Sequence, residues 1–491
     1  MSPVSGITAG SRGTTAGRRL VRHDEEAVLT TGPMNESSGG TTAGPAHTPA
    51  RTPADARTAG AAGADAGGSG SASRPAGWRT GDGFHRMWRD LAPVGRHAAS
   101  GGYRRFAWTG ADADCRAWFR AQALARGLRY EVDRNGNQWA WLGGPHPGAA
   151  AGPGERAVAT GSHLDSVPDG GAFDGPLGVV SAFAALDELH GRGAVPRRPI
   201  AVAAFADEEG ARFGLACVGS RLTAGQLDPE HARALRDADG TTLAQAMERA
   251  GHDPEAIGPD PERLAGLAAF VELHIEQGRA LEPAGSPLGA ASAIWPHGRW
   301  RFDFRGRADH AGTTALADRH DPMLTYATTV LAARKKARLA GALATFGKVA
   351  VEPGGVNAIA ALVRGWLDSR APDEETLAGL VAAVEHAARE RAARDGTTVE
   401  VVRESATPRV DFAAELRDRV AALAGGGTPV PVLPTGAGHD AGILAAAVPT
   451  AMLFVRNPTG VSHSPAEHAA EEDCAAGVSA LADVLEGLAC R

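Results

Sequence analysis

Short apolar runs of strand length alternate with amphipathic stretches along most of this chain. Residues 157–161, 200–206 and 268–274 are runs of mainly small and β-branched residues, and residues 178–190 have the pattern of an amphipathic helix. Parallel strands need a crossover connection, usually a helix, and their two buried faces make them continuous apolar runs. The alternation predicts an α/β fold with a mostly parallel sheet and helices on both faces. Further strands are predicted at residues 129–133, 138–142 and 451–455, and further helices at 413–424 and 472–488.

Imidazoles and carboxylates occur at or just past the ends of these runs. They are His163, Asp165, Glu208, Glu209 and His274. In open α/β sheets, ligands bind beyond the carboxyl ends of the strands, so these side chains are expected to meet at one edge. A single residue of this kind is more often structural than functional. Their recurrence at successive strand ends favours one common site.

Asp174 and His463 extend this set to that of a two-metal centre. Asp174 is flanked by glycines, which let the backbone approach closely, and one carboxylate can give an oxygen to each of two cations. We expect His163 and His274 to complete one metal site, and Glu209 and His463 the other. Mixed nitrogen and oxygen ligands suit Zn²⁺, Mn²⁺, Co²⁺ or Ni²⁺ better than Ca²⁺ or Mg²⁺. Two divalent ions per subunit, Mn²⁺ or Zn²⁺ first, are predicted.

Glu208 and Asp165 are expected to serve the chemistry without binding metal. As a general base, Glu208 would take a proton from the attacking water and pass it to the leaving nitrogen. Asp165 follows His163 by two residues in an extended segment, so it would point the same way and accept the second imidazole N–H. The predicted activity is metal-dependent hydrolysis.

A second, smaller unit is predicted from Trp300 onward. Strand, helix, strand, strand, helix and strand are expected at residues 300–304, 322–340, 343–351, 361–368, 374–394 and 398–403. The order βαββαβ fits an open-faced sandwich of four antiparallel strands and two helices. The expected domains are a catalytic domain in two parts, 78–296 and 405–491, interrupted by an inserted domain at 297–404.

Residues 1–77 differ in composition from the rest. They contain no Phe, Trp or Tyr and are rich in Gly, Ala, Thr, Ser and Pro. Such a segment cannot bury enough apolar surface to offset its ordering entropy, so a disordered low-complexity tail is predicted. It could be a spacer, a partner-binding tail or upstream sequence translated from an early start codon. A tail without function is favoured because it holds no clear motif.

Charge and cysteine content exclude several classes of partner. The chain has 50 Lys and Arg against 57 Asp and Glu, which gives no basic excess for nucleic acid. No apolar run approaches the ~20 residues of a membrane span, and no apolar stretch at the N-terminus indicates a secretory signal. The four cysteines are scattered, which favours free thiols over disulfides. We expect a soluble cytoplasmic protein with neither nucleic acid nor membrane as partner.

The segments that carry the candidate residues resemble a known family. They are Gly161-Ser-His-Leu-Asp-Ser, Gly170-Gly-Ala-Phe-Asp-Gly, Asp207-Glu-Glu-Gly-Ala-Arg-Phe, Glu272-Leu-His-Ile-Glu-Gln-Gly, Asp309-His-Ala-Gly-Thr-Thr, Gly436-Ala-Gly-His-Asp-Ala and Ser462-His-Ser-Pro-Ala-Glu. The chain resembles the dinuclear-metal amidohydrolases related to aminoacylases and carboxypeptidase-type exopeptidases. More closely, it is similar to the branch with allantoate amidohydrolase, N-carbamoyl-L-amino-acid hydrolase and β-ureidopropionase. The resemblance covers about residue 84 to the end.

The resemblance implies roles that the residues alone do not indicate. His310 corresponds to a histidine that reaches the site of the other subunit and stabilises the developing oxyanion. Arg370 corresponds to an arginine that clamps the substrate carboxylate, and Asn357 and Gln277 correspond to polar substrate contacts. The inserted domain corresponds to a lid and dimerisation unit, so a homodimer is implied.

The branch also implies a substrate class. Its members cut a ureido or carbamoyl C–N bond next to a carboxylate, so a small ureido-carboxylate is expected. Residues 454–467 and 345–348 look most like the allantoate enzymes, which favours conversion of allantoate to ureidoglycine, ammonia and carbon dioxide. N-carbamoyl-L-amino-acid hydrolase or β-ureidopropionase activity is the alternative. A peptidase is less expected, and the intact ligand set disfavours a non-catalytic binding protein. His439 and Asp440 either orient groups near the site or form a structural turn.

Overall fold

The structure is a computed structural model that describes residues 83–144 and 155–490. The tail predicted at residues 1–77 lies outside the described residues. The α-helices are α1 Gly83–Leu91, α2 Gly110–Ala125, α3 Pro176–Gly191, α4 Val218–Thr223, α5 Pro229–Ala234, α6 Leu243–Arg249, α7 Pro261–Ala265, α8 Leu281–Ala284, α9 Pro322–Ala340, α10 Glu374–Asp395, α11 Ala414–Ala424, α12 Asp440–Leu444 and α13 Glu471–Ala489. Two 3₁₀ turns lie at Pro254–Ala256 and Leu316–Asp318.

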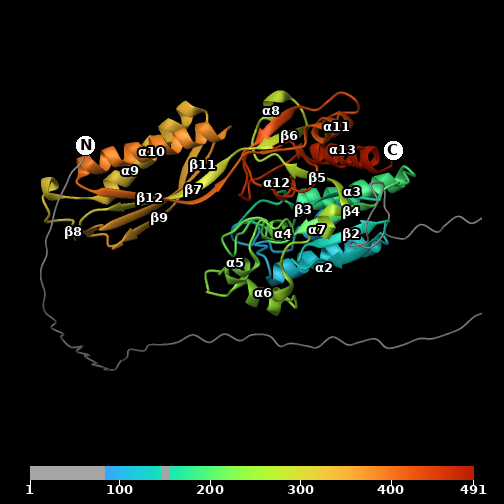
Figure 1. The fold of residues 1–491 in the computed structure, drawn as a ribbon, viewed down its shortest axis with the longest axis horizontal. Coiled ribbons are helices and arrows are strands. Elements are labelled where there is room, and N and C mark those ends of the chain that lie inside the picture. Colours follow the sequence, from blue (N-terminus) through green and yellow to red (C-terminus); the bar gives the residue numbers. More distant parts are fainter. Residues whose placement is uncertain (1–82, 145–154, 491) are drawn as a thin grey trace, which may run out of the picture. The chain divides into compact units, whose positions relative to one another are not determined.

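The strands form two principal sheets (Figure 1). Their bounds are β1 Arg129–Val132, β2 Gln138–Leu142, β3 Ala157–His163, β4 Ile200–Phe205, β5 Leu267–Ile275, β6 Leu288–Ile294, β7 His297–Arg305, β8 Asp309–His310, β9 Leu343–Glu352, β10 Ala358–Ile359, β11 Leu362–Arg370, β12 Thr398–Thr407, β13 Val410–Asp411, β14 Val432–Thr435 and β15 Thr450–Val455. The larger sheet has the order β1-β2-β4-β3-β5-β15-β6-β13, with β14 beside β6.

The centre of the larger sheet is parallel, as the apolar runs predict. Strands β4, β3, β5 and β15 pair in parallel, and β14 pairs in parallel with β6. The pairs β1-β2, β2-β4, β15-β6 and β6-β13 are antiparallel. The strands predicted at 129–133 and 138–142 are present and form an antiparallel hairpin, since Val132 at the end of β1 pairs with Gln138 at the start of β2. The α/β fold with a mostly parallel sheet is therefore confirmed, and its outer strands add antiparallel pairs.

Helices cover both faces of this sheet because its strands bury side chains on both sides. Along β4, Val202 and Ala204 pack in a core with residues of α1, α2, α3, α11 and α13. Ala203 and Phe205 alternate with them and join a second core with residues of α7, α8 and α12. The two-residue period of a strand explains why one apolar run supplies both cores.

The smaller sheet has the predicted βαββαβ order, formed by β7, α9, β9, β11, α10 and β12. Its strands are antiparallel in the order β12-β7-β11-β9. Helices α9 and α10 pack against each other and along one face of this sheet (Figure 1). Phe302, Val363 and Leu367 of the strands meet Ala333 and Val384 of the helices in a separate core.

Among the described residues, no helix combines the length and the apolar character needed to cross a bilayer. All four cysteines lie in the described part of the chain, and no disulfide joins them there, as expected from their spacing.

Candidate metal centre

The residues expected to bind metal come together at the carboxyl ends of the central parallel strands. His163 is the last residue of β3, and His274 lies next to the end of β5. Glu209 follows β4, Asp174 lies in the loop between β3 and α3, and His463 lies in the loop after β15. The neighbouring order β4-β3-β5-β15 places these five residues at one edge of the sheet.

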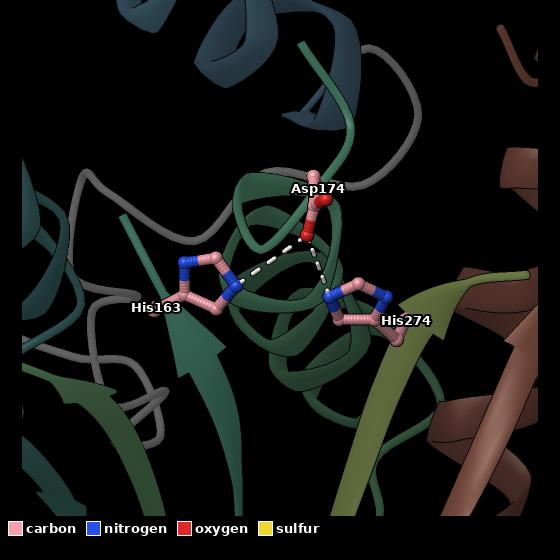
Figure 2. A group of neighbouring side chains, drawn as sticks. All are labelled: His163, Asp174 and His274. Atoms are coloured by element: carbon pink, nitrogen blue, oxygen red, sulfur yellow. Dashed lines mark ion pairs between the residues drawn. The ribbon is translucent and has the colours of Figure 1, made fainter. Parts of the chain in front are cut away.

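His163, Asp174 and His274 form one buried group of possible ligands. Asp174 Oδ1 lies 3.6 Å from His163 Nε2 and 3.2 Å from His274 Nε2. Figure 2 shows the two imidazoles, carried by β3 and β5, pointing toward this carboxylate from two sides. Gly175 next to Asp174 has φ +83°, and a Cβ there would lie 2.4 Å from the His163 ring. The glycine is required because the backbone passes so close to the imidazole.

Hydrogen bonds orient both imidazoles of this group. His163 Nδ1 lies 3.2 Å from the main-chain oxygen of Asp165, and His274 Nδ1 lies 2.9 Å from the oxygen of Ile275. A carbonyl oxygen only accepts, so each Nδ1 carries the proton and donates. Each Nε2 atom therefore faces Asp174 as the nitrogen available to a metal ion, the arrangement that metal-binding histidines require.

Asp174, Glu209 and His463 form a second group that shares Asp174 with the first. Asp174 Oδ2 lies 3.4 Å from His463 Nε2, which lies 3.7 Å from Glu209 Oε2. In each group the possible ligand atoms all lie within 4.8 Å of one another. One Asp174 oxygen thus faces each group, which is the geometry expected of a carboxylate that bridges two cations.

The charges of the site call for cations. Burial lowers the pKa of His163, but the carboxylates of Glu208, Asp165 and Asp174 outweigh it and raise the pKa well above its ordinary value. The hydrogen bond to Asp174 raises the pKa of His463 to about 9, and burial raises the pKa of Glu209 to about 7. Protons on imidazoles thus offset the buried carboxylates, and divalent ions would supply the same positive charge in exchange for those protons.

Unused donor atoms also fit metal binding. Glu209 Oε1 is buried and has no hydrogen-bond partner among the described residues. His274 Nε2 is 3.2 Å from Asp174 Oδ1, yet the contact lacks hydrogen-bond geometry. Buried polar atoms are rarely left unsatisfied, so both atoms indicate a missing partner. Imidazole nitrogens and carboxylate oxygens are ligands that suit divalent transition metals.

Glu208 lies beside the first group without belonging to it. Its Oε2 is 3.8 Å from His163 Nε2, and its Oε1 accepts a hydrogen bond of 3.3 Å from the Cys217 thiol. Burial raises the pKa of Glu208 well above its ordinary value. A carboxylate whose proton affinity is raised in this way is suited to accept a proton at neutral pH.

Asp165 makes contacts in addition to the expected one with His163. Its carboxylate oxygens accept the N–H groups of Glu208 and Glu209 at 3.2 and 3.1 Å. Its Oδ1 lies 3.5 Å from His163 Nδ1, farther than its own main-chain oxygen at 3.2 Å. Asp165 therefore orients the imidazole mainly through its backbone, and its carboxylate fixes the segment that carries the expected base and ligand.

Gln277 and His310 occupy different surroundings. Gln277 Nε2 donates to Asp174 Oδ2 at 2.9 Å and lies 3.4 Å from His463 Nε2, so its amide lies against the second ligand group. His310 is an exposed residue of β8, and no contact to either ligand group is found within the described ranges. Its Nδ1 accepts the Gly312 N–H at 2.9 Å, so its Nε2 is a hydrogen-bond donor.

Asn357 lies beside the two-stranded sheet of β8 and β10, and Arg370 lies in the four-stranded smaller sheet. Neither residue belongs to a ligand group. Asn357 precedes β10, and its carbonyl accepts the N–H of Ala311, next to His310. Arg370 ends β11 and donates to both carboxylate oxygens of Asp368 at 2.9 and 3.2 Å, and to the oxygen of Gly436 at 2.6 Å. Three of its five N–H groups are engaged, so it keeps donors for a further anion.

A third possible ligand group consists of Glu272, His274 and His439, and it shares His274 with the first group. Both oxygens of Glu272 are already used, since they accept the Ser162 hydroxyl at 2.7 Å and the Ala441 N–H at 2.9 Å. Burial and the neighbouring His274 lower the pKa of His439 well below its ordinary value. His439 is therefore a neutral imidazole packed against His274, with ring centroids 4.5 Å apart, and Glu272 has a hydrogen-bonding role.

Two acidic residues inside the quoted motifs have contacts that the sequence did not predict. Glu272 lies inside the apolar run of β5, where a buried acid is itself an indication of a specific partner. Glu467 ends the motif that contains His463, and it is buried. Its Oε2 accepts the N–H groups of Phe173 and Asp174, each at 3.0 Å.

Comparison with known proteins identifies the family. The sequence profile of the peptidase family M20/M25/M40 matches residues 159–487, more than half of the chain. The chain belongs to this family. The family is hydrolytic and metal-dependent, and the described residues hold a cluster of possible metal ligands. The expected relationship to amidohydrolases and the prediction of a hydrolase of non-peptide C–N bonds are confirmed.

Relatives match this M20 chain over most of their length. N-carbamoyl-L-amino acid amidohydrolase of Geobacillus stearothermophilus is 38% identical over 411 residues, which cover 81% of this chain and 96% of the relative. Allantoate amidohydrolase of Escherichia coli K12 is 32% identical over 400 residues, 79% of this chain and 94% of the relative. A crystal structure of an amidase of the hydantoinase/carbamoylase family from Burkholderia vietnamiensis has a TM-score of 0.73 and 31% identity, and covers 83% of this chain and 98% of the other.

Proposed function

We propose that this M20 chain hydrolyses a ureido or carbamoyl C–N bond next to a carboxylate. The observation that carries the proposal is the Asp174 carboxylate, which presents one oxygen to each of two ligand groups. Relatives with 38% and 32% identity are named for hydrolysis of N-carbamoyl-L-amino acids and of allantoate. Both substrates contain a ureido group and a carboxylate, so the two names agree on the class of bond.

We propose two divalent ions as cofactors, held by the two groups that share Asp174. His163 and His274 would hold one ion with Asp174, and Glu209 and His463 the other. Mn²⁺ and Zn²⁺ are the first candidates for this donor set, with Co²⁺ and Ni²⁺ next. When bound, a pair of such ions polarises the scissile carbonyl and lowers the pKa of water.

The chain's own residues would move the protons. Glu208 is positioned to take a proton from the attacking water and deliver it to the leaving nitrogen, because it lies beside the first group and belongs to neither ligand group. Asp165 holds Glu208 in place through its hydrogen bond to the Glu208 N–H. Water attack and transfer of that proton release the nitrogen as ammonia and leave a carbamate, which loses carbon dioxide.

Four residues would bind the substrate. Arg370 would clamp the carboxylate with its remaining N–H groups, and Asn357 and Gln277 would add polar contacts. His310 would donate its Nε2 hydrogen to the developing oxyanion, which fits the tautomer set by the Gly312 N–H. These roles follow from the resemblance to the ureido-cleaving branch and from the donors that the side chains keep free.

Allantoate is the first substrate that we propose, with ureidoglycine, ammonia and carbon dioxide as products. The segments at residues 345–348 and 454–467, which resemble those of allantoate enzymes, support it. N-carbamoyl-L-amino acids are the second candidate, with β-ureidopropionate as their β-amino-acid analogue. The relative named for N-carbamoyl-L-amino acids supports this second candidate, because its identity of 38% exceeds the 32% of the allantoate enzyme.

Ammonia release tests the proposal. Metal-replete protein is incubated with allantoate, N-carbamoyl-L-amino acids and β-ureidopropionate in parallel, with the Glu208→Gln variant as the blank. Fast release from allantoate alone supports the first candidate, and preference for a carbamoyl amino acid supports the second. Protein that cleaves dipeptides but none of these compounds would overturn the proposal.

We further propose residues 297–404 as an inserted lid and dimerisation domain between catalytic parts 78–296 and 405–491. Strands β7, β9, β11 and β12 and helices α9 and α10 share a core of their own, which supports the division. Helix α9 leaves Leu324, Leu331 and Leu339 at 54%, 69% and 73% exposed, and β9 is an edge strand of its sheet. An apolar helix face beside an unpaired edge is suited to pair with a second copy.

We propose a cytoplasmic location for the protein. Cysteines without disulfides suit this reducing compartment.

A further inference from the structure

Three of the expected ligands, Asp174, Glu209 and His463, lie outside the strands. His163 and His274 are carried by β3 and β5, whose backbones are fixed by the sheet. Asp174 and His463 lie in loops that are remote from each other in sequence, and His463 has φ +56°, a left-handed conformation that is unfavourable outside glycine. Such a conformation persists only where neighbouring contacts hold it, so the contacts between these loops set the ligand geometry.

Glu467 joins the two loops. The side chain is buried, and its Oε2 accepts the N–H groups of Phe173 and Asp174, each at 3.0 Å. The Ser462 hydroxyl lies 3.3 Å from Glu467 Oε1 and also 3.3 Å from Asp174 Oδ2, so it can donate to either. Glu467 thus holds the backbone of one ligand, Asp174, and contacts the residue that precedes the other, His463.

The fit around Glu467 is close. A Cβ on Gly171 would lie 2.2 Å from Glu467 Oε2 and 2.6 Å from its Cβ and Cδ. The Phe173 ring meets the His468 ring edge to face, with centroids 6.1 Å apart, so the loops also pack beside the carboxylate. Because no room remains for even a methyl group, the carboxylate position is fixed from both loops.

We infer that Glu467 is the positioning residue that sets Asp174 against His463 and thereby determines the affinity of the second metal site. This inference rests on the proposed two-metal function. Loss of Glu467 should weaken the site of Asp174, Glu209 and His463 more than the first site, because His163 and His274 keep their places on the strands. Residues that orient metal ligands typically account for about 10–100-fold in affinity, and we expect a loss of this size at the second site.

Calorimetric titration of metal-free protein with Mn²⁺ alone tests the inference. Wild-type protein should bind in two steps, and the step that His463→Ala removes identifies the second site. Glu467→Ala should weaken that step about 10–100-fold and the other step less. Glu467→Gln should retain most of the affinity, because an amide oxygen can still accept both N–H bonds. Gly171→Ala should weaken the same step by displacing the carboxylate.

Asp303→Asn is the matched control. Asp303 is a buried carboxylate of the smaller sheet that accepts hydrogen bonds from Arg301 and Arg364 and contacts neither ligand group. This variant should lower the melting temperature of metal-free protein and leave both binding steps unchanged. The control separates a general loss of stability from a change at the metal centre.

Three results would overturn the inference. Unchanged second-step affinity in Glu467→Ala, or in Gly171→Ala if Glu467→Ala does not fold, would remove Glu467 as the positioning residue. Equal weakening of both steps, in proportion to lost stability, would show a purely structural role. Wild-type protein that binds no metal would overturn the proposed function as well, whereas the first two results leave that function standing.

Discussion

At the scale of single residues, Glu208 has a role that can be separated from metal binding. It belongs to neither ligand group; its carboxylate accepts a hydrogen bond from the Cys217 thiol, and its backbone N–H donates to Asp165. Glu208→Gln keeps the shape but cannot accept the proton, so we expect kcat to fall about 10²–10⁴-fold. Metal content, measured by mass spectrometry on the same preparation, should stay at the wild-type value. Turnover close to wild type would exclude Glu208 as the base.

Arg370 permits a second test at this scale. Asp368 and Gly436 hold its guanidinium in place. Removal of the side chain should therefore weaken substrate binding more than it slows the catalytic step. Hydrogen bonds to charged groups contribute about 1.5–3 kcal/mol, so Arg370→Ala should raise KM about 10–100-fold for a carboxylate substrate. The matched control is the same measurement with an analogue in which an amide replaces the carboxylate, where the variant should behave like wild type. An unchanged KM for the carboxylate substrate would exclude the clamp.

The sequence predicted the ligand groups but not all of their surroundings. His163, Glu209 and His274 could be found because each follows or ends an apolar run, and parallel strands bring such ends together. Arg370 and Asn357 carry no local indication and were expected only from the family resemblance. The contact of Glu467 with Asp174 joins residues 293 positions apart, and no spacing rule reaches that far.

At the scale of elements, the accuracy of a prediction depended on how strongly the sequence marks the two ends of the helix or strand. Helix α9 was expected at 322–340 and has those bounds, since Asp321 caps its first turn, Pro322 opens it and Gly341 ends it in a left-handed conformation. Strand β6 was not expected, because Leu-Gly-Ala-Ala-Ser-Ala-Ile has few β-branched residues and no alternation. The short helices between Val218 and Ala265 were also missed, since each is below the length at which a helical period is visible.

Two helical glycines provide a matched prediction for element packing. A Cβ on Gly178 in α3 would lie 2.2 Å from the Leu273 oxygen of β5, so Gly178→Ala should push the helix off the sheet and destabilise the fold by about 1–3 kcal/mol. Gly379 in α10 has no atom within 4 Å of such a Cβ, and Gly379→Ala should stabilise by about 0.5–1 kcal/mol. Chemical denaturation of the two variants measures both changes. A Gly178→Ala variant with the wild-type free energy of unfolding would show that α3 can shift without loss of stability.

At the scale of the whole molecule, the metal centre is assembled from segments that precede and follow the smaller sheet in the sequence. Strands β3, β4 and β5 precede that sheet, and β15 with the His463 loop follows it. Strand β15 pairs in parallel with β5, which returns the chain to the site. The intervening residues contribute no member of either ligand group among the described residues. They do contain His310, Asn357 and Arg370, so three of the four expected substrate contacts come from this intervening segment, whereas Gln277 lies with the metal ligands.

This separation leads to a prediction about subunits. His310 is exposed, presents Nε2 as a donor and has no described contact with the ligand groups, so we expect it to complete the site of a second copy. His310→Ala and Glu208→Gln should each be inactive alone. If the two are refolded or co-expressed in equal amounts, about half of the dimers are mixed and each has one intact site, which gives about a quarter of wild-type activity.

The control for this mixing experiment is a pair of variants that cannot complement. His310→Ala mixed with a protein carrying both His310→Ala and Glu208→Gln has no source of His310, so it should remain inactive at every ratio. Mixing at about a tenfold excess of Glu208→Gln should place nearly every His310→Ala subunit in a mixed dimer and raise activity per His310→Ala subunit about twofold over the equal mixture. Activity that never exceeds the sum of the separate variants would mean that His310 acts within its own subunit, and the exposed face of α9 would then need another explanation.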